Sequence, residues 1–167
     1  YRCNPEDMSP LREIVPIAFG LGRPEEAVRY AIIASEREPS DPAMMRRLAQ
    51  FLTEQGEFAR AIGLYEKALA LPEARPQSAD GVKMKMELGR LYFLDGQFDK
   101  AADAVATFEL ALNEPQTFGL SPAEHKDLLG DDGSASYGLC GECYLLAKRY
   151  DDAERALDSM RRLMEAI

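Results

Sequence analysis

The sequence predicts an all-α protein built from about four consecutive pairs of antiparallel helices. The first observation is a period of 34 residues, which places Gly22 on Gly56 and Ala27 on Ala61. The second is that apolar residues recur at helical spacing within each period, and the third is that glycines separate its two halves. A fixed period of 20–50 residues is typical of repeat arrays, in which each repeat buries its apolar face against its neighbours.

The period continues toward the C-terminus with two insertions. A shift of 40 residues places Ala61 on Ala101, and a further shift of 52 places Ala101 on Ala153. The extra residues fit around Arg75–Gly81 and around 116–133, where Pro, Gly, Ser and Asp are frequent, as loops require. We therefore expect a single domain of four repeats, near residues 8–41, 42–75, 82–115 and 134–167.

The first repeat is the least regular. Pro16 falls inside its first helix, where the ring removes a backbone hydrogen bond and should kink the helix. Residues 1–7 resemble the end of an earlier repeat, because two of them match the residues that close the first repeat. The last helix also carries apolar residues such as Leu163 and Met164, which a terminal repeat would leave uncovered. We therefore expect a fragment of a longer protein.

The second repeat is the clearest. Asp41 and Pro42 suit the N-cap and the first position of a helix, and Gly56 suits the left-handed residue that ends one. Ala61, like Ala101 in the third repeat, should be buried where two helices cross, because a small side chain lets them approach closely.

The third and fourth repeats depart from the pattern at a few positions. Val105 and Phe108 stand where an aromatic residue and an alanine are expected, which suggests a shifted or lengthened second helix in the third repeat. In the fourth repeat, Lys148 replaces the turn glycine.

The insertion at 116–133 carries a helix signal of its own. Ser121 is followed by Pro122 and then by Glu124, which is the pattern of a capping box. We expect a short extra helix near 121–129. His125, the only histidine of the chain, lies on it, and we expect a lone surface histidine to have no catalytic role.

This arrangement resembles the tetratricopeptide repeat (TPR), in which a Leu–small pair, a large residue, a turn Gly and then Ala, an aromatic residue and Ala follow at fixed spacing. The second repeat shows Leu48-Ala49, Leu52, Gly56, Ala61, Tyr65, Ala68 and Pro72. The third shows Leu88-Gly89, Tyr92, Gly96, Ala101 and Pro115, and the fourth shows Gly141, Tyr144, Tyr150, Ala153 and Leu157. The resemblance implies a right-handed superhelical array of antiparallel helix pairs, an α-solenoid, with a concave groove that binds a protein or peptide.

By this resemblance, the groove is lined by residues of the first helix of each pair that do not face the core. The candidate partner-binding residues are Arg12, Arg46, Gln50, Lys83, Met86, Arg90 and Phe93, with Phe19 and Thr53 as further candidates. Their cations could meet carboxylates, which favours an acidic partner. Some family members hold a peptide's terminal carboxylate with Lys, Asn and Arg, but Glu87 replaces the Asn here. The alternative is that these charges are ordinary solvated residues.

Composition narrows the functional classes. The net charge of −9 argues against a nucleic-acid-binding protein, which needs a basic stripe. No run of 18 or more apolar residues is present, so we expect no membrane insertion. The cytoplasm is slightly favoured as the compartment. No glycine-rich phosphate loop follows a strand, and we expect no cofactor.

Cys140 and Cys143 have the spacing of redox and zinc motifs. That chemistry needs a helix N-terminus or a second pair of ligands, whereas these cysteines fall within a helix and Cys140 aligns with the core residue Leu88. We expect both to be small core residues and expect no metal site, with zinc binding or redox chemistry as the alternative.

Three functional hypotheses follow. The leading one is a non-enzymatic module that binds a peptide or protein partner in the groove of a larger scaffold. The second is an assembly element that forms a homo-oligomer through apolar residues of the C-terminal helix, Met160, Leu163 and Ile167. The third is an accessory array of an enzyme whose catalytic domain lies elsewhere.

Overall fold

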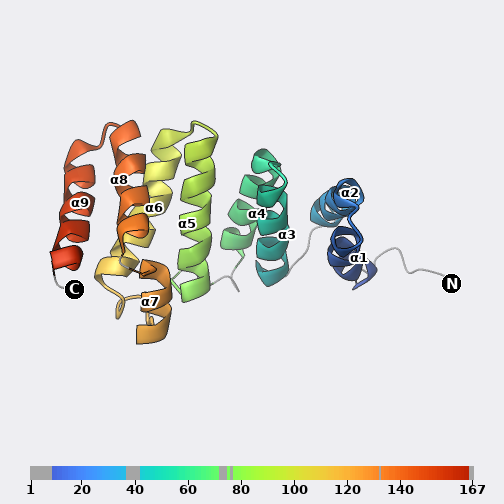
Figure 1. Ribbon diagram of the computed structural model, residues 1–167, viewed down its shortest axis with the longest axis horizontal. Coiled ribbons are helices and arrows are strands. Elements are labelled where there is room, and N and C mark those ends of the chain that lie inside the picture. The colour runs from blue at the N-terminus through green and yellow to red at the C-terminus, as the bar shows by residue number, and fades with distance from the viewer. Residues whose placement is uncertain (1–8, 37–41, 72–74, 76, 132, 166–167) are drawn as a thin grey trace. The chain divides into compact units, whose positions relative to one another are not determined.

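The computed structural model describes residues 9–36, 42–71, 75, 77–131 and 133–165, and shows helices and their connections (Figure 1). Within those ranges there is no β-strand. The all-α class predicted from the sequence is confirmed. The chain forms two compact units, residues 1–73 (unit 1) and residues 74–167 (unit 2).

Unit 1 contains two helix pairs. Its helices are α1 (Ser9–Gly20), α2 (Pro24–Glu36), α3 (Pro42–Glu54) and α4 (Phe58–Ala70). α1 packs against α2, α3 packs against α4, and α2 contacts α3. Pro16 lies inside α1, and Pro42 is the first residue of α3.

Unit 2 contains two further pairs and one extra helix. Its helices are α5 (Ala79–Leu94), α6 (Phe98–Asn113), α7 (Pro122–Leu129), α8 (Ser134–Leu146) and α9 (Tyr150–Glu165). α6 has 16 residues where its counterpart α4 has 13, so the second helix of the third repeat is lengthened, as predicted. α6 packs against both α5 and α8, and α8 packs against α9.

The first, second and fourth pairs lie inside the predicted ranges 8–41, 42–75 and 134–167, whereas α5 begins at Ala79, three residues before the predicted third range of 82–115. The extra helix α7 lies within the predicted 121–129 segment, so that expectation is confirmed. Residues 1–7 and Asp41 lie outside the described residues. The continuity of the four repeats as one domain stays a prediction of the sequence.

Small residues mark the helix crossings. Ala61 and Ala101 have no exposed surface, as predicted. Gly89 on α5 lies so close to α6 that an added Cβ would be 2.5 Å from Cγ1 of Val105. A glycine here therefore allows the close approach of the two helices.

The turns within the pairs have a common backbone geometry. Gly22, Gly56 and Gly96 adopt φ angles of 71°, 78° and 75°. Lys148 holds the equivalent place between α8 and α9 with a φ of 60°. This left-handed conformation is readily adopted by glycine and strained for a residue with a Cβ.

We expect Lys148→Gly to stabilise unit 2 by about 1 kcal/mol, because it removes this backbone strain. Thermal unfolding of the whole chain, followed by circular dichroism, should show a higher midpoint. The reverse change at the matching turn, Gly96→Lys, is the control and should lower the midpoint. A lower midpoint for Lys148→Gly would contradict the prediction.

The insertion packs firmly on unit 2. Ser121 and Glu124 form the predicted capping box at the start of α7. His125 Nε2–H donates to the carbonyl oxygen of Leu112 at 2.8 Å, which joins α7 to the end of α6. Ser136 Oγ donates to the carbonyl oxygen of Leu128 at 2.7 Å, which joins α8 to α7. His125 therefore has a structural partner, and the insertion is part of the fold.

Candidate protein-binding face

The candidate residues of unit 2 lie on one face of α5. Lys83, Met86, Arg90 and Phe93 follow one another at helical spacing, and Arg90 is exposed while the other three are half-buried. α8 contacts α5 and lies beside it (Figure 1).

The corresponding stripe of α8 follows from the sequence alignment of the repeats. A shift of 52 residues places Met86 on Gly138, Arg90 on Glu142 and Phe93 on Leu145. Glu142 and Leu145 are exposed, and Gly138 is half-exposed. We call these two stripes together the α5–α8 face. It consists of Lys83, Met86, Arg90 and Phe93 on α5 and of Gly138, Glu142 and Leu145 on α8.

Both cations of this face are already in ion pairs. Lys83 Nζ lies 2.5 Å from Oδ2 of Asp127 on α7, and Arg90 Nη2 lies 2.7 Å from Oε2 of Glu87 on the same helix. The insertion thus contributes a carboxylate to one end of the face. The face is therefore less basic than its sequence alone indicates.

Unit 1 carries its own candidate residues on α3. Gln50 is exposed and Arg46 is half-buried. Thr53 Oγ1 donates to the carbonyl oxygen of Ala49 at 2.9 Å, so its hydroxyl is used within the helix. The side chains of Arg12 and Phe19 on α1 lie outside the described residues. α3 belongs to unit 1 and α5 to unit 2, so the candidate residues of each helix are described by themselves.

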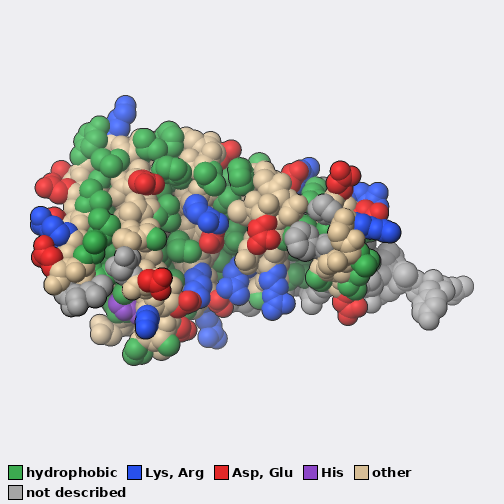
Figure 2. Space-filling model, viewed as in Figure 1, with side chains coloured by type: hydrophobic (Ala, Val, Ile, Leu, Met, Phe, Trp, Pro, Cys, Tyr) green, Lys and Arg blue, Asp and Glu red, His purple; other side chains and the backbone are tan. Residues whose placement is uncertain are grey.

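An apolar rim continues the α5–α8 face where α5 and α8 end. Leu94, Leu145, Leu146 and Tyr150 are exposed large hydrophobic residues at these ends. Hydrophobic side chains gather along the edge of unit 2 that carries the α5–α6 and α8–α9 turns (Figure 2). Sequence reasoning missed this rim, although the shift of 52 places Leu94 on Leu146 and would have revealed the recurring leucine.

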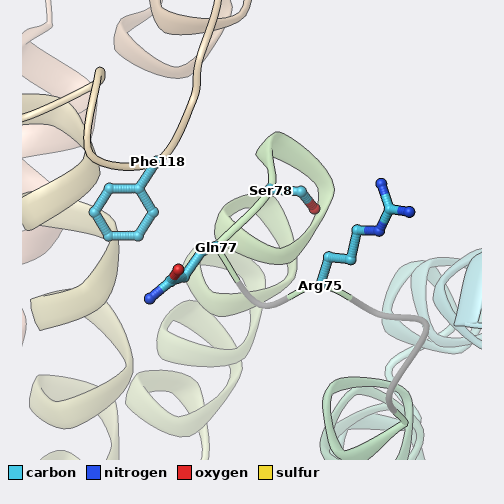
Figure 3. Close-up of a pocket in the computed structure, with 4 residues that line it drawn as sticks. All are labelled: Arg75, Gln77, Ser78 and Phe118. Carbon is cyan, nitrogen blue, oxygen red and sulfur yellow. The ribbon is translucent and has the colours of Figure 1, made fainter.

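A pocket of about 470 Å³ lies beside the start of α5 and is lined by Arg75, Gln77, Ser78 and Phe118. Gln77 points toward the ring of Phe118, whereas Arg75 extends away on the other side of Ser78 (Figure 3). Ser78 Oγ accepts a hydrogen bond from the amide of Gly81 and caps α5. The lining side chains do not converge on one point, so the pocket does not form a defined site.

A buried carboxylate lies between α6, α8 and α9. Glu109 of α6 is only 3% exposed, and its Oε2 accepts a hydrogen bond of 2.8 Å from the hydroxyl of Tyr144 on α8. Its Oε1 has no hydrogen-bond partner, but lies 3.7 Å from Nε of Arg155 on α9. Burial, and then the bond to Glu109, raise the pKa of Tyr144 well above its usual value. This cluster joins three helices internally.

The two cysteines of α8 are buried. Burial raises the pKa of both thiols, in the case of Cys143 to about 12. The thiolate is the form that attacks disulfides and binds metals. The environment therefore favours the structural role predicted for Cys140 and Cys143 over redox or zinc chemistry.

We expect Cys140 and Cys143 to react very slowly with a disulfide reagent at pH 8 in the folded chain and rapidly after unfolding in urea. A Cys3→Ser background removes the third thiol from the measurement. Because folding raises these pKa values, the thiols also contribute stability that is lost as pH rises from the ordinary value of 9.0 toward about 12. Fast labelling under native conditions would contradict the prediction.

The described helices define a class of protein, the helical repeat array, and comparison with known proteins identifies the repeat. Residues 13–79 match the family model of the tetratricopeptide repeat. No curated protein matches the sequence significantly. The resemblance to the TPR family drawn from the sequence is confirmed over these residues.

Solved structures share this fold. BtubC from P. vanneervenii is 22% identical, with a TM-score of 0.66 over 99% of this chain and 67% of its own. A putative kinesin light chain from Podosopora anserina with nearly identical TPR-like repeats is 18% identical, with a TM-score of 0.62 over 97% of this chain and 78% of its own. A structure of MamA is 16% identical, with a TM-score of 0.61 over 99% of this chain and 82% of its own. At these identities the likeness concerns the fold.

None of the described helices is both long enough and apolar enough to cross a bilayer.

Proposed function

We propose that this chain is a non-enzymatic protein-interaction scaffold whose first helices of each pair hold a peptide or protein partner. The observation that carries the proposal is the α5–α8 face. Its neighbours on the same helices are buried in the repeat core, whereas its own residues are half-buried or exposed and the adjoining rim is exposed. A repeat array leaves such a surface free because the stacking of repeats uses the other faces.

The face has the mixed chemistry that protein interfaces require. Met86, Phe93 and Leu145 offer apolar surface, and covering it contributes roughly 25 cal/mol per Å² before the cost of ordering the partner. The charged residues between them can fix the register of an extended or helical segment. A few central contacts usually supply most of the binding free energy.

The proposal can be tested with a random 12-residue peptide library displayed on phage and selected on the immobilised chain. The affinity of enriched peptides is then measured by fluorescence anisotropy. We expect Leu145→Ala to weaken binding about tenfold, which is 1.4 kcal/mol. Leu110→Ala on α6 is a matched control, because Leu110 is 45% exposed and Leu145 is 47% exposed.

The control should bind as the unchanged chain does. Failure to enrich any peptide, or equal effects of the two substitutions, would overturn the assignment of the face. The acidic partner favoured by the sequence stays a prediction. On the α5–α8 face such a partner would have to compete with Asp127 and Glu87 for the two cations.

A second candidate function is self-association through α9. Leu157 and Met164 are exposed on this helix, while Ile167 lies outside the described residues. Sedimentation equilibrium over a wide concentration range tests this function, with Leu157→Glu as the disrupting variant. A chain that stays monomeric at every concentration would rule out self-association through α9.

A further inference from the structure

We propose that the α5–α8 face takes an apolar segment that carries a lysine or arginine, and that Glu142 is the carboxylate that meets this cation. The inference rests on the proposed function and names the chemistry of the partner. The sequence alone favours an acidic partner for this surface, whereas this inference assigns it a basic one.

The charge of the face changes sign between its two helices. Glu142 on α8 occupies the position that Arg90 holds on α5. Arg90 is held by Glu87, whereas Glu142 is exposed and has no ion-pair partner within the described residues. The remaining cation of the face, Lys83, is held by Asp127. The one carboxylate left for a partner is therefore that of Glu142.

The surroundings of Glu142 suit a long cationic side chain. One turn before it, a Cβ added to Gly138 would meet no atom within 4 Å, so this part of the helix surface is open. One turn after it, Leu145 is exposed. Lysine and arginine place an aliphatic stem on apolar surface and keep the charged group at its edge. Such a stem can lie over Gly138 and Leu145 while its charge meets Glu142.

Long-range electrostatics act in the same direction. The chain carries a net charge of −9, and a field of one sign attracts ligands of the other and increases their association rate. A basic segment is attracted by the whole chain and by Glu142, whereas an acidic segment is repelled by both. The interaction should weaken as salt concentration rises, because exposed charges are screened.

The test uses three fluorescein-labelled synthetic peptides of 12 residues. They share one neutral host of Leu, Ala, Ser and Gln and differ only at two positions, which carry Lys, Gln or Glu. At low salt we expect the Lys peptide to bind the whole chain about tenfold more tightly than the Glu peptide. Glu142→Gln should remove most of this preference, and Glu142→Lys should reverse it.

Arg90→Gln is the matched control, because it changes the charge at the corresponding position of α5. It should leave the Lys peptide preferred. Circular dichroism of each variant verifies that the fold is retained. Equal binding of the Lys and Glu peptides, or a Lys preference as large in Glu142→Gln as in the unchanged chain, would overturn the inference.

The same measurements distinguish this inference from the proposed function. If library-selected peptides bind and respond to Leu145→Ala but none of the three synthetic peptides binds, the inference alone is overturned. If neither library-selected nor synthetic peptides bind, both are overturned.

Discussion

Tyr144→Phe is expected to destabilise unit 2 by about 2–3 kcal/mol. The hydroxyl of Tyr144 donates the single close hydrogen bond to Glu109 that the described residues provide. Without this bond, the carboxylate of Glu109 stays buried with no hydrogen-bond donor. The nearest cation among the described residues is the largely exposed Arg155, whose Nε lies 3.7 Å from Oε1 of Glu109. Loss of a hydrogen bond to a buried charged group typically costs this much.

A second substitution shows whether the loss comes from the carboxylate. Glu109→Met combined with Tyr144→Phe removes both polar partners and keeps the volume, so the pair should recover most of the lost stability. Differential scanning calorimetry of the whole chain measures the unfolding of each variant. A double variant less stable than Tyr144→Phe alone would show that Glu109 contributes through other contacts.

This cluster explains how α9 is held in place. Only Ala153 and Ala156 of its described residues are fully buried, while Met160 and Leu163 are half-buried. One ion pair reinforces this packing, because Arg149, directly before α9, bonds to Asp103 of α6 at 3.0 Å. The pair of Arg155 and Asp152 at 2.8 Å lies within α9 itself. Because such pairs near the surface are individually weak, α9 depends on the combination of both kinds of contact.

Sequence predicts best those parts of the fold that short, local residue patterns determine. The fixed spacing of Ala61 and Ala101 predicts two crossings that are fully buried in the structure. The order of Ser121, Pro122 and Glu124 predicts the start of α7, and the structure has a capping box there. In each case a few neighbouring residues determine the backbone conformation.

The parts that sequence does not predict depend on residues far apart in the chain. Lys83 pairs with Asp127, 44 residues away, so its side chain is less available to a partner than a helix-face pattern indicates. Glu109 pairs with Tyr144, 35 residues away, and a helical pattern places such a glutamate in solvent. One signal was present: the shift of 40 places Leu69 on Glu109, a carboxylate at an apolar position.

Gly89→Leu is expected to destabilise unit 2 by about 3 kcal/mol. The first added carbon would already lie 2.5 Å from Cγ1 of Val105 and 3.5 Å from the carbonyl oxygen of Ala101. Val105 has no exposed surface and is β-branched, so it can neither move into solvent nor rotate freely. The helices α5 and α6 must then separate, and overpacking of this kind typically costs 1–3 kcal/mol and occasionally more.

The same substitution at Gly138 is the matched control, because that glycine lies within a helix of the same unit and a Cβ added there would meet no other part of the fold within 4 Å. Gly138→Leu should stabilise the helix by up to about 1 kcal/mol, since leucine favours a helix far more than glycine does. Adding Val105→Ala to Gly89→Leu should restore part of the lost stability by making room. If the α5–α6 contact is correct, calorimetry of the three variants shows a loss of stability for Gly89→Leu and a gain for Gly138→Leu. A loss at Gly138 equal to that at Gly89 would show instead that leucine disturbs both helices for a reason unrelated to this contact.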